Sequence, residues 1–265
     1  MRRETFAQAA AGVGASALNR VFERYPIPIT FSSEQLHLHM IYNDVDAGAS
    51  PLWYDDDGNV LAAALLAIRA KRGWIGGFGV APEYRHHGYA AELSNTLKDT
   101  ARARGLASIQ LEVLSDNIPA VNAYRSAGFE IARTLLSFEC LVQDGSKPSG
   151  FVTSTPDDFI DLPDARTPCW QRERRTLRNG AVSTAVSDGG QTYALFRFNR
   201  QVGQVLKLGA PSAEAVDDLA AAIAAGREFQ SILLLNEPED SPIAAYVKAA
   251  GWTATFTQYE MLLHI

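Results

Sequence analysis

The sequence predicts an α+β protein of two domains, in which sheets are covered by helices. Strand-sized apolar segments near residues 50–54, 60–70 and 74–80 are separated by short turns, which is typical of an antiparallel meander. Helical and strand segments alternate after them. The two halves end alike, with 120-AVNAYRSAGFE-130 and 242-PIAAYVKAAGWT-253. This weak repeat, at a period of about 110–120 residues, suggests a duplicated domain.

The N-terminal segment, MRRETFAQAAAGVGASALN, has two interpretations. Its basic start and A-x-A-like end outline a signal peptide. Its middle holds Val13 as the only strong apolar residue, and apolar residues continue at helical spacing to Phe22. We expect an amphipathic helix from about Phe6 to Arg24, with the signal peptide as the alternative.

The remaining elements of the first half follow from local signals. Pro26 and Pro28 end the first helix, and 32-SSE-34 caps a second one. After the meander we expect a helix to Gly105, a strand at Ser108–Leu114, a short helix at Pro119–Ala127 and a strand near Phe129–Val142.

The polar segment 143-QDGSKPSG-150 is the best linker, so we place the domains at residues 1–144 and 145–265. Beyond it we expect a helical stretch at Pro168–Leu177, strands near 181–186, 191–199 and 201–208, a helix from Ser212 to Ala225, a strand at Ser231–Leu235, a helix through Ile243–Ala250 and a final strand to Leu263.

Composition excludes several classes of protein. The chain has 265 residues, 47% of them apolar, and a net charge of −6 with both signs mixed. This balance argues against a nucleic-acid or anionic-membrane partner, and no apolar run is long enough to span a bilayer. Cys140 and Cys169 stand alone, which argues against zinc and is typical of an intracellular protein. We expect a cytoplasmic location.

The segment 79-GVAPEYRHHGYA-90 places a turn between a strand and the start of a helix. A helix start has unpaired amide N–H groups and partial positive charge, both of which suit a phosphate. Gly88 would let the phosphate approach the backbone, Ala90 would leave the first turn uncrowded, and Arg85 would add a cation. The alternative is an ordinary surface turn.

Two other interpretations of this segment fit less well. Gly77-Phe78-Gly79 lacks the third glycine of a dinucleotide fingerprint. His86 and His87 are adjacent, so their side chains diverge, and no third ligand has a supporting spacing. We therefore expect no metal.

Two elements together resemble the GCN5-related N-acetyltransferase (GNAT) superfamily. Arg85-x-x-Gly88-x-Ala90 is similar to its acetyl-CoA signature, Gln/Arg-x-x-Gly-x-Gly/Ala. Downstream, 117-NIPAVNAYRSAGF-129 resembles the family's Asn-x-x-Ala-x-x-x-Tyr-x-x-x-Gly-Phe element. The resemblance covers residues 50–142 well. It implies a mixed, mostly antiparallel sheet flanked by helices, here in two tandem GNAT-like domains.

The resemblance implies an N-acetyltransferase that passes the acetyl group of acetyl-CoA to a primary amine by direct attack in a ternary complex. The cofactor arm would pair with the fourth strand, Ile75–Val80, where a bulge splays it from the fifth. Amides near Phe78 and Val80 would hold the thioester carbonyl. The implied cofactor-binding residues are Phe78, Gly79, Val80, Arg85, His86, His87, Gly88, Tyr89, Ala90 and Asn117.

The catalytic candidates are Tyr124 and Glu112. Tyr124 has the family's position for the acid that protonates the leaving thiolate; the alternative is a packed aromatic residue. Glu112, in 111-LEVL-114, is a candidate general base, although an exposed or paired carboxylate is the simpler interpretation. Asn117 is also a good N-cap. Further candidates on the acceptor side are His37, His39, Tyr42, Asp44, Asp46, Trp53 and Trp74.

The second half departs from the signature. The segment 208-LGAPSAEAVDDLA-220 has no Arg-x-x-Gly, and its Glu214, Asp217 and Asp218 would repel a phosphate. We predict a degenerate GNAT-like domain without its own cofactor; an unrelated α+β domain is the alternative. The alternative function for the whole chain is a non-catalytic acyl-CoA-binding or regulatory protein. The sequence does not identify the acceptor, which is a small molecule or a peptide amine. It also leaves undecided whether the protein forms a homodimer.

Overall fold

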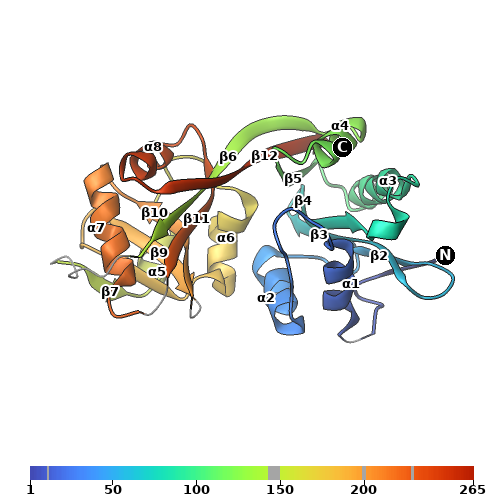
Figure 1. Ribbon diagram of the computed structural model, residues 1–265, viewed down its shortest axis with the longest axis horizontal. Helices are drawn as coiled ribbons and strands as arrows, with labels where there is room; N and C mark the ends of the chain where they lie inside the picture. The colour runs from blue at the N-terminus through green and yellow to red at the C-terminus, as the bar shows by residue number, and fades with distance from the viewer. Residues whose placement is uncertain (11, 143–149, 199–200, 228–229) are drawn as a thin grey trace. The chain divides into compact units, whose positions relative to one another are not determined.

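The computed structural model describes residues 1–10, 12–142, 150–198, 201–227 and 230–265 (Figure 1). The chain forms two compact units: unit 1 comprises Met1–Ala132 and Glu260–Ile265, and unit 2 comprises Arg133–Tyr259. The division falls within a strand, β6 (Glu130–Leu141), upstream of the predicted boundary at residue 144. Most of the predicted linker, residues 143–149, lies outside the described residues.

Unit 1 is built on a mixed sheet. Its strands, in order across the sheet, are β1 (Arg2–Thr5), β2 (Pro51–Tyr54), β3 (Val60–Arg69), β4 (Arg72–Val80) and β5 (Ser108–Leu114), followed by the end of β12 (Thr253–His264). Strands β1 to β4 are antiparallel neighbours, whereas β4 and β5 are parallel because a helix connects them.

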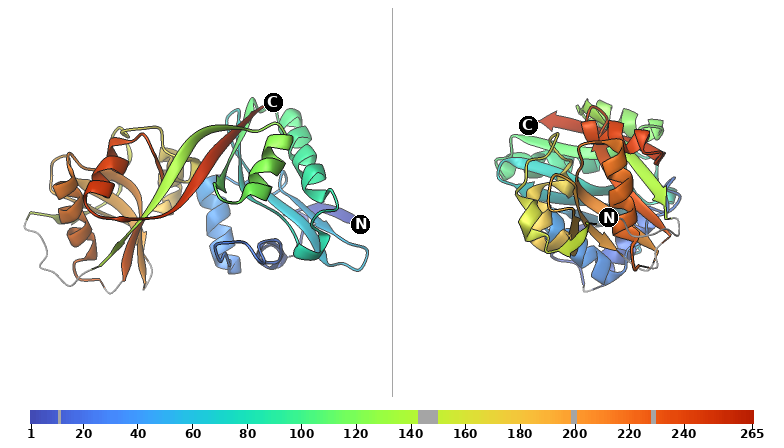
Figure 2. Two further views of the ribbon diagram at one scale, coloured as in Figure 1. Left: turned by 45° about the horizontal axis from the view of Figure 1, so that its top comes forward. Right: turned by 90° about the vertical axis from the view of Figure 1, so that its left-hand side faces the viewer.

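Four helices of unit 1 cover this sheet: α1 (Val13–Val21), α2 (Ser33–Asn43), α3 (Tyr89–Ala103) and α4 (Ile118–Ser126). Figure 2 shows α1 and α2 on one face and α3 and α4 on the other. The helix α1 buries Leu18 and Val21 against Leu52 and Leu65 of the sheet. The predicted cap of α2 is confirmed, because the Ser32 side chain accepts the Gln35 amide in a capping box.

The prediction of a first helix from Phe6 was wrong. Residues Arg2–Thr5 form β1, which pairs with β2, and α1 begins only at Val13. The guanidinium of Arg3 lies 4.6 Å from the Trp53 ring, and Gly12 has a left-handed backbone (φ 84) at the start of α1. The amides of Phe6 and Ala7 donate to the carbonyl oxygens of Ser50 (2.9 Å) and Ala47 (3.1 Å), so long-range backbone bonds replace the predicted first helical turn.

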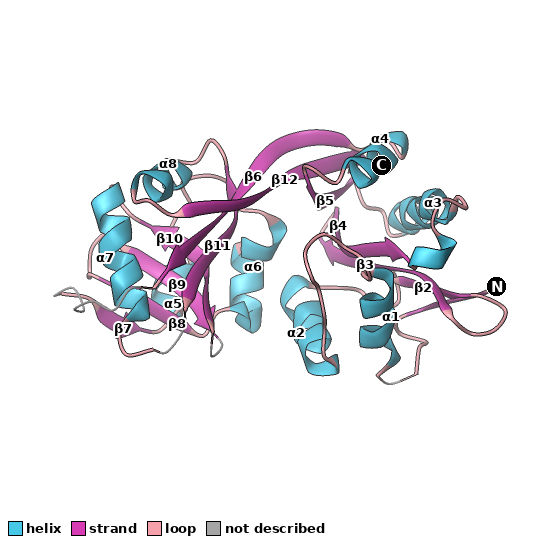
Figure 3. Cartoon of the chain, in the orientation of Figure 1, coloured by secondary structure: helices cyan, strands magenta, loops and turns pink. Residues whose placement is uncertain are grey.

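Unit 2 repeats the element order of unit 1 (Figure 3). Its strands lie in the order β12, β6, β11 (Ser231–Pro238), β10 (Val202–Gly209), β9 (Tyr193–Phe198), β8 (Thr184–Ser187) and β7 (Val152–Ser154). Its helices are α5 (Asp157–Ile160), α6 (Arg174–Thr176), α7 (Ala213–Ala224) and α8 (Pro242–Ala249). The helical stretch predicted at Pro168–Leu177 is present as short segments, a 3₁₀ turn at Trp170–Arg172 followed by α6 and a further turn at Leu177–Ala181.

The repeat relates β2-β3-β4-α3-β5-α4-β6 to β8-β9-β10-α7-β11-α8-β12. As in unit 1, the two strands joined by the longer helix, β10 and β11, are parallel. The last strands are exchanged, because β6 lies beside β11 and the end of β12 lies beside β5. In the described part of the chain, no helix is both long and apolar enough to cross a bilayer.

Candidate active site

Strands β4 and β5 separate part-way along unit 1. Arg72–Ile75 pair with Ser108–Leu111, and the ladder ends there. On the other edge of β4, the register with β3 shifts so that Leu65 faces Gly77 and Leu66 faces Ile75. Gly76 is therefore the extra residue of a β-bulge, which bends the strand. The predicted bulge and splay are present, and an extended group placed in the gap could pair with the freed edge of β4.

The two faces of β4 beyond the bulge differ. A Cβ atom added to Gly79 would lie 2.9 Å from the Val21 Cβ and 3.0 Å from its carbonyl oxygen, so α1 packs directly on the strand. The Phe78 side chain points to the opposite face, where its ring centroid lies 5.6 Å from that of Tyr124. Glycine is needed at residue 79 because the end of α1 leaves no room for a side chain.

The N-terminus of α3 faces open space. A 3₁₀ turn at Pro82–Tyr84 follows β4, and His86 (φ 67) and Gly88 (φ 85) then adopt left-handed conformations. Gly88 is the N-cap, and no side chain caps the helix. A Cβ atom on Gly88 would meet nothing within 4 Å. The first amide N–H groups of α3 can therefore receive an anion, so these residues fit a phosphate group.

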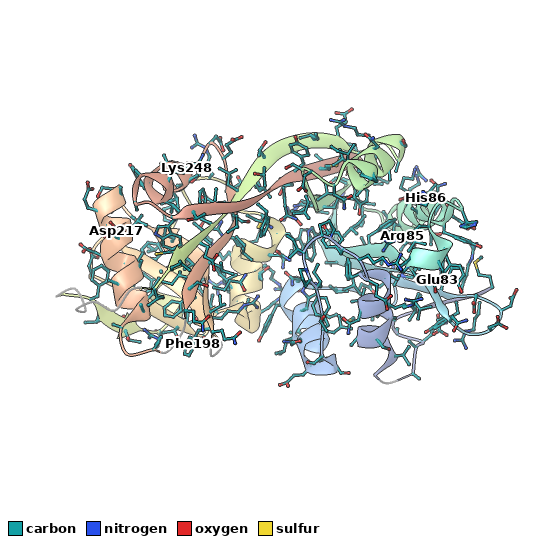
Figure 4. The ribbon with its side chains drawn as sticks, viewed as in Figure 1. Glu83, Arg85, His86, Phe198, Asp217 and Lys248 are labelled. Atoms are coloured by element: carbon teal, nitrogen blue, oxygen red, sulfur yellow. The ribbon has the colours of Figure 1, made fainter. Side chains whose placement is uncertain are left out.

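The structure gives the Arg85 side chain a different task from the one predicted. Its guanidinium donates to the carbonyl oxygens of Val80 (3.0 Å), Val21 (3.3 Å) and Glu23 (2.8 Å), and so ties the end of α1 to the end of β4 (Figure 4). A phosphate contact by this side chain stays a prediction. The neighbouring His86 and His87 are exposed. Among the described residues, no three His, Cys, Asp or Glu side chains cluster so that they could hold a metal ion.

Helix α4 carries two of the predicted site residues. Asn117 is its N-cap, as predicted, with its Oδ1 accepting the Ala120 amide at 3.4 Å. The Tyr124 ring packs between Phe78 and Phe129, with a centroid distance of 5.7 Å to the latter. Burial raises the pKa of Tyr124, and the charge of Tyr25 raises it further. The phenol is therefore protonated at neutral pH, as a proton donor must be.

Glu112 lies where the gap between the strands begins. It follows Leu111, the last β5 residue that pairs with β4. Its Oε2 accepts a hydrogen bond of 2.6 Å from the Trp74 indole. The Trp74 ring also packs against the His39 imidazole, with 5.9 Å between the ring centroids. The carboxylate is half-buried and is held in place at the base of the gap.

Other predicted acceptor-side residues have structural roles. Asp44 accepts a hydrogen bond of 2.8 Å from Arg69, and Asp46 pairs with Arg104 at 2.5 Å. Trp53 is fully buried. The acceptor-side role of exposed residues on α2, such as His37, is still a prediction.

Sequence reasoning missed the anchoring of the turn after α1. The segment 25-YPIP-28 was interpreted only as the end of the first helix, yet the Arg85 guanidinium donates to the Val21 and Glu23 carbonyl oxygens just before it. No sequence signal joins Arg85 to these residues, because the contacts depend on how α1 packs on β4.

Unit 2 has the same frame without the open helix end. The β9–β10 register shifts between Val205 and Lys207, and β10 pairs with β11 only as far as Val205 and Leu234. In contrast to α3, α7 is capped by its own Ser212 hydroxyl, which accepts the Ala215 amide at 3.3 Å. Glu214 adds negative charge in the first turn.

The gap between β10 and β11 holds a buried arginine. The Arg172 guanidinium donates to the carbonyl oxygens of Leu206 (3.0 Å) on β10 and of Leu235 and Asn236 (3.3 Å each) on β11. It also forms an ion pair of 2.5 Å with Glu237, and both side chains are less than a tenth exposed. One side chain thus bonds backbone carbonyl groups of both strands beyond the point where their pairing ends.

Comparison with known proteins places this fold. Residues 16–129 match the acetyltransferase (GNAT) family. A GCN5-related N-acetyltransferase from Sphaerobacter thermophilus matches with a TM-score of 0.74 and 13% identity, over 99% of this chain and 95% of its own. A tandem GNAT protein from the clavulanic acid biosynthesis pathway matches with a TM-score of 0.67 and 12% identity, over 99% and 98%. A GCN5-related N-acetyltransferase from Kribbella flavida matches at 0.57 and 18%, over 98% and 71%.

At these identities the solved structures establish the fold. The repeated element order of the two units agrees with the fold of a tandem protein. The chain therefore has the tandem GNAT fold, and residues 16–129, within its first unit, are similar to the GNAT acetyltransferase family.

Proposed function

We propose that unit 1 is an acetyl-CoA-dependent N-acyltransferase that transfers an acetyl group to a primary amine by direct attack in a ternary complex. The observation that carries this proposal is the uncapped N-terminus of α3 beside the gap between β4 and β5. An uncapped helix start suits a pyrophosphate, and a freed strand edge suits the amides of a pantetheine arm. When bound, acetyl-CoA supplies an activated acyl group as a thioester.

The residues proposed to hold the cofactor lie along one path. The backbone from Arg85 to Ala90 would bind the phosphates, with His86, His87 and Tyr89 bordering them. Phe78, Gly79 and Val80 would present their backbone to the arm, and Asn117 would bond it from α4.

The catalytic roles follow from position and protonation. Glu112 would accept the proton of the attacking amine, directly or through water, while Trp74 holds its carboxylate. Amides near Phe78 would stabilise negative charge that develops on the carbonyl oxygen. Tyr124, a protonated phenol, would donate its proton to the departing sulphur.

We propose one cofactor site per chain. In unit 2, Ser212 and Glu214 occupy the helix start where a phosphate would bind, and Arg172 fills the gap where the arm would lie. Unit 2 would therefore be a degenerate domain that binds no cofactor of its own.

The alternative is a non-catalytic acyl-CoA-binding or regulatory protein. It is favoured by the hydrogen bond between Trp74 and Glu112, because this bond already occupies one carboxylate oxygen of the proposed base.

Two measurements on the full-length protein test the proposal. Calorimetric titration with coenzyme A should give one site per chain. Two equivalent sites would contradict the proposal that unit 2 binds no cofactor. Labelled acetyl-CoA should then be incubated with a panel of amino acids, polyamines, aminoglycosides and peptides. Transfer to at least one amine is expected. Tight cofactor binding with transfer to no amine would favour the non-catalytic alternative.

A further inference from the structure

A tryptophan on β4 joins the bulge of that strand to the candidate base. The Trp74 indole is 1% exposed, donates its N–H to the Glu112 carboxylate at 2.6 Å and packs against the His39 ring. A Cβ atom added to Gly76 would lie 2.2 Å from the Trp74 Cζ3 and 2.7 Å from its Cη2. The outer ring of the indole therefore lies directly over Gly76, the extra residue of the bulge.

The indole has no room to give way to a side chain at residue 76. The ring is buried, and the Glu112 carboxylate and the His39 imidazole hold it in place, so a Cβ atom at residue 76 would displace it and strain the hydrogen bond. The next glycine differs, because a Cβ atom on Gly77 would lie 3.6 Å from the Leu65 Cγ, an ordinary contact. The need for glycine is therefore specific to residue 76.

Unit 2 shows that the bulge itself does not require glycine. The register of β10 with β9 shifts between Val205 and Lys207, which makes Leu206 the extra residue there. Leu206 is buried, so a bulge at the same place in the sheet accommodates a large apolar side chain. The glycine of unit 1 is thus explained by the indole that covers it and not by the bend of the strand.

The parallel ladders of the two units can be aligned residue by residue. Each ladder ends at one pair, Ile75 with Leu111 in unit 1 and Val205 with Leu234 in unit 2. Counting from these pairs, the residues of unit 2 that stand in place of Trp74, Gly76 and Glu112 are Gln204, Leu206 and Leu235. The unit that we propose binds no cofactor therefore lacks the indole, the glycine and the carboxylate together.

We propose that Trp74 and Gly76 are positioning residues that fix the Glu112 carboxylate for the attack of the amine. Gly76 leaves the space over the bulge that the indole fills, and the indole holds the carboxylate where β4 and β5 separate. A carboxylate held in this way can accept the proton of the amine without first being reoriented. This inference rests on the acyl transfer proposed above.

Steady-state kinetics on the full chain test this role. Trp74→Phe keeps an aromatic ring and removes the indole N–H, so kcat should fall roughly ten- to a hundredfold while the KM for acetyl-CoA stays nearly unchanged. Gly76→Ala should cause a similar loss. Adding Gly76→Ala to Trp74→Phe should cause little further loss, because both changes act through the same hydrogen bond and the shorter ring ends before the outer indole carbons.

The nitrogen-15 signal of the Trp74 indole gives a readout without turnover. This signal, identified by its absence in Trp74→Phe, should shift in Gly76→Ala and in Glu112→Gln. It should stay in place in Gly77→Ala, the matched control, because a Cβ atom there makes only ordinary contacts. An unmoved signal in a folded Gly76→Ala variant would show that the glycine does not determine where the indole lies.

The kinetic outcomes separate this role from the proposed function. A normal kcat in Trp74→Phe, or losses that multiply in the double variant, would overturn the positioning role while wild-type transfer persists. If Gly76→Ala does not fold, the split between kcat and KM in Trp74→Phe decides. If the wild-type protein transfers acetyl to no amine, the proposed function fails and this role fails with it.

Discussion

Two substitutions of Gly88, to Asn and to Asp, test whether a phosphate binds at the start of α3. The two new side chains have nearly the same shape and differ in charge. The Gly88 backbone is left-handed (φ 85), and a side chain there would meet nothing within 4 Å. Asn and Asp are the non-glycine residues that best tolerate this conformation, at a cost of about 1 kcal/mol. Gly88→Asn and Gly88→Asp should therefore have similar free energies of unfolding. The difference between their affinities for coenzyme A then measures the effect of one negative charge.

The expected effect on cofactor binding follows from Coulomb's law. A carboxylate about 4 Å from a phosphate charge, at an effective dielectric constant of about 20, is repelled by about 4 kcal/mol, which salt reduces. We expect Gly88→Asp to bind coenzyme A roughly 10²–10³-fold more weakly than Gly88→Asn in calorimetry, with a gap that narrows as ionic strength rises. Equal affinities in two folded variants would show that the phosphates bind elsewhere.

Three further substitutions test the site and unit 2. Tyr124→Phe should keep cofactor affinity and lower kcat by roughly 10²–10⁴-fold, the usual contribution of a positioned acid, and near-normal turnover would leave Tyr124 a packing residue. Glu112→Gln should lower kcat, because it removes the carboxylate proposed to accept the proton of the amine; an unchanged kcat would assign the base elsewhere. Arg172→Met strands the Glu237 carboxylate in the interior and should destabilise unit 2 by about 3–5 kcal/mol in urea unfolding. Arg172→Met with Glu237→Leu should recover the part of that loss that comes from the stranded carboxylate and stay less stable than wild type, because three backbone carbonyls still lose their donor. A double variant as unstable as the single one would show that the pair does not act as a unit.

Local signals predicted most elements of unit 1. Strand β5 has the predicted bounds, and Ser32 and Asn117 cap helices as expected, because a cap depends on residues three or four positions away. The start of the first helix was mispredicted because the amides of Phe6 and Ala7 bond the carbonyl oxygens of Ser50 and Ala47, far along the chain. The short segment FAQAA carries no local sign of those partners.

The resemblance to the family located the candidate site, but it did not predict how its side chains are used. Arg85 matches the signature by type, and its guanidinium bonds backbone carbonyls on α1 and β4. Glu112 is likewise held by a distant residue, because the Trp74 indole donates to its carboxylate at 2.6 Å. Both facts depend on atoms that are distant in sequence, so no periodicity or motif could reveal them.

Unit 2 keeps the frame of this fold without the features that we propose bind the cofactor in unit 1. It keeps the bulge, the parallel pair and the connecting helix, which are backbone features that the packing of its core supports. The sequence predicted the absence of a cofactor site from the missing motif and the acidic helix start alone. The structure adds an independent reason to expect this absence, because Arg172 donates to carbonyls on β10 and β11. Removing Arg172 would leave α7 capped by Ser212, and removing Ser212 would leave the gap filled, so neither change alone should restore a cofactor site.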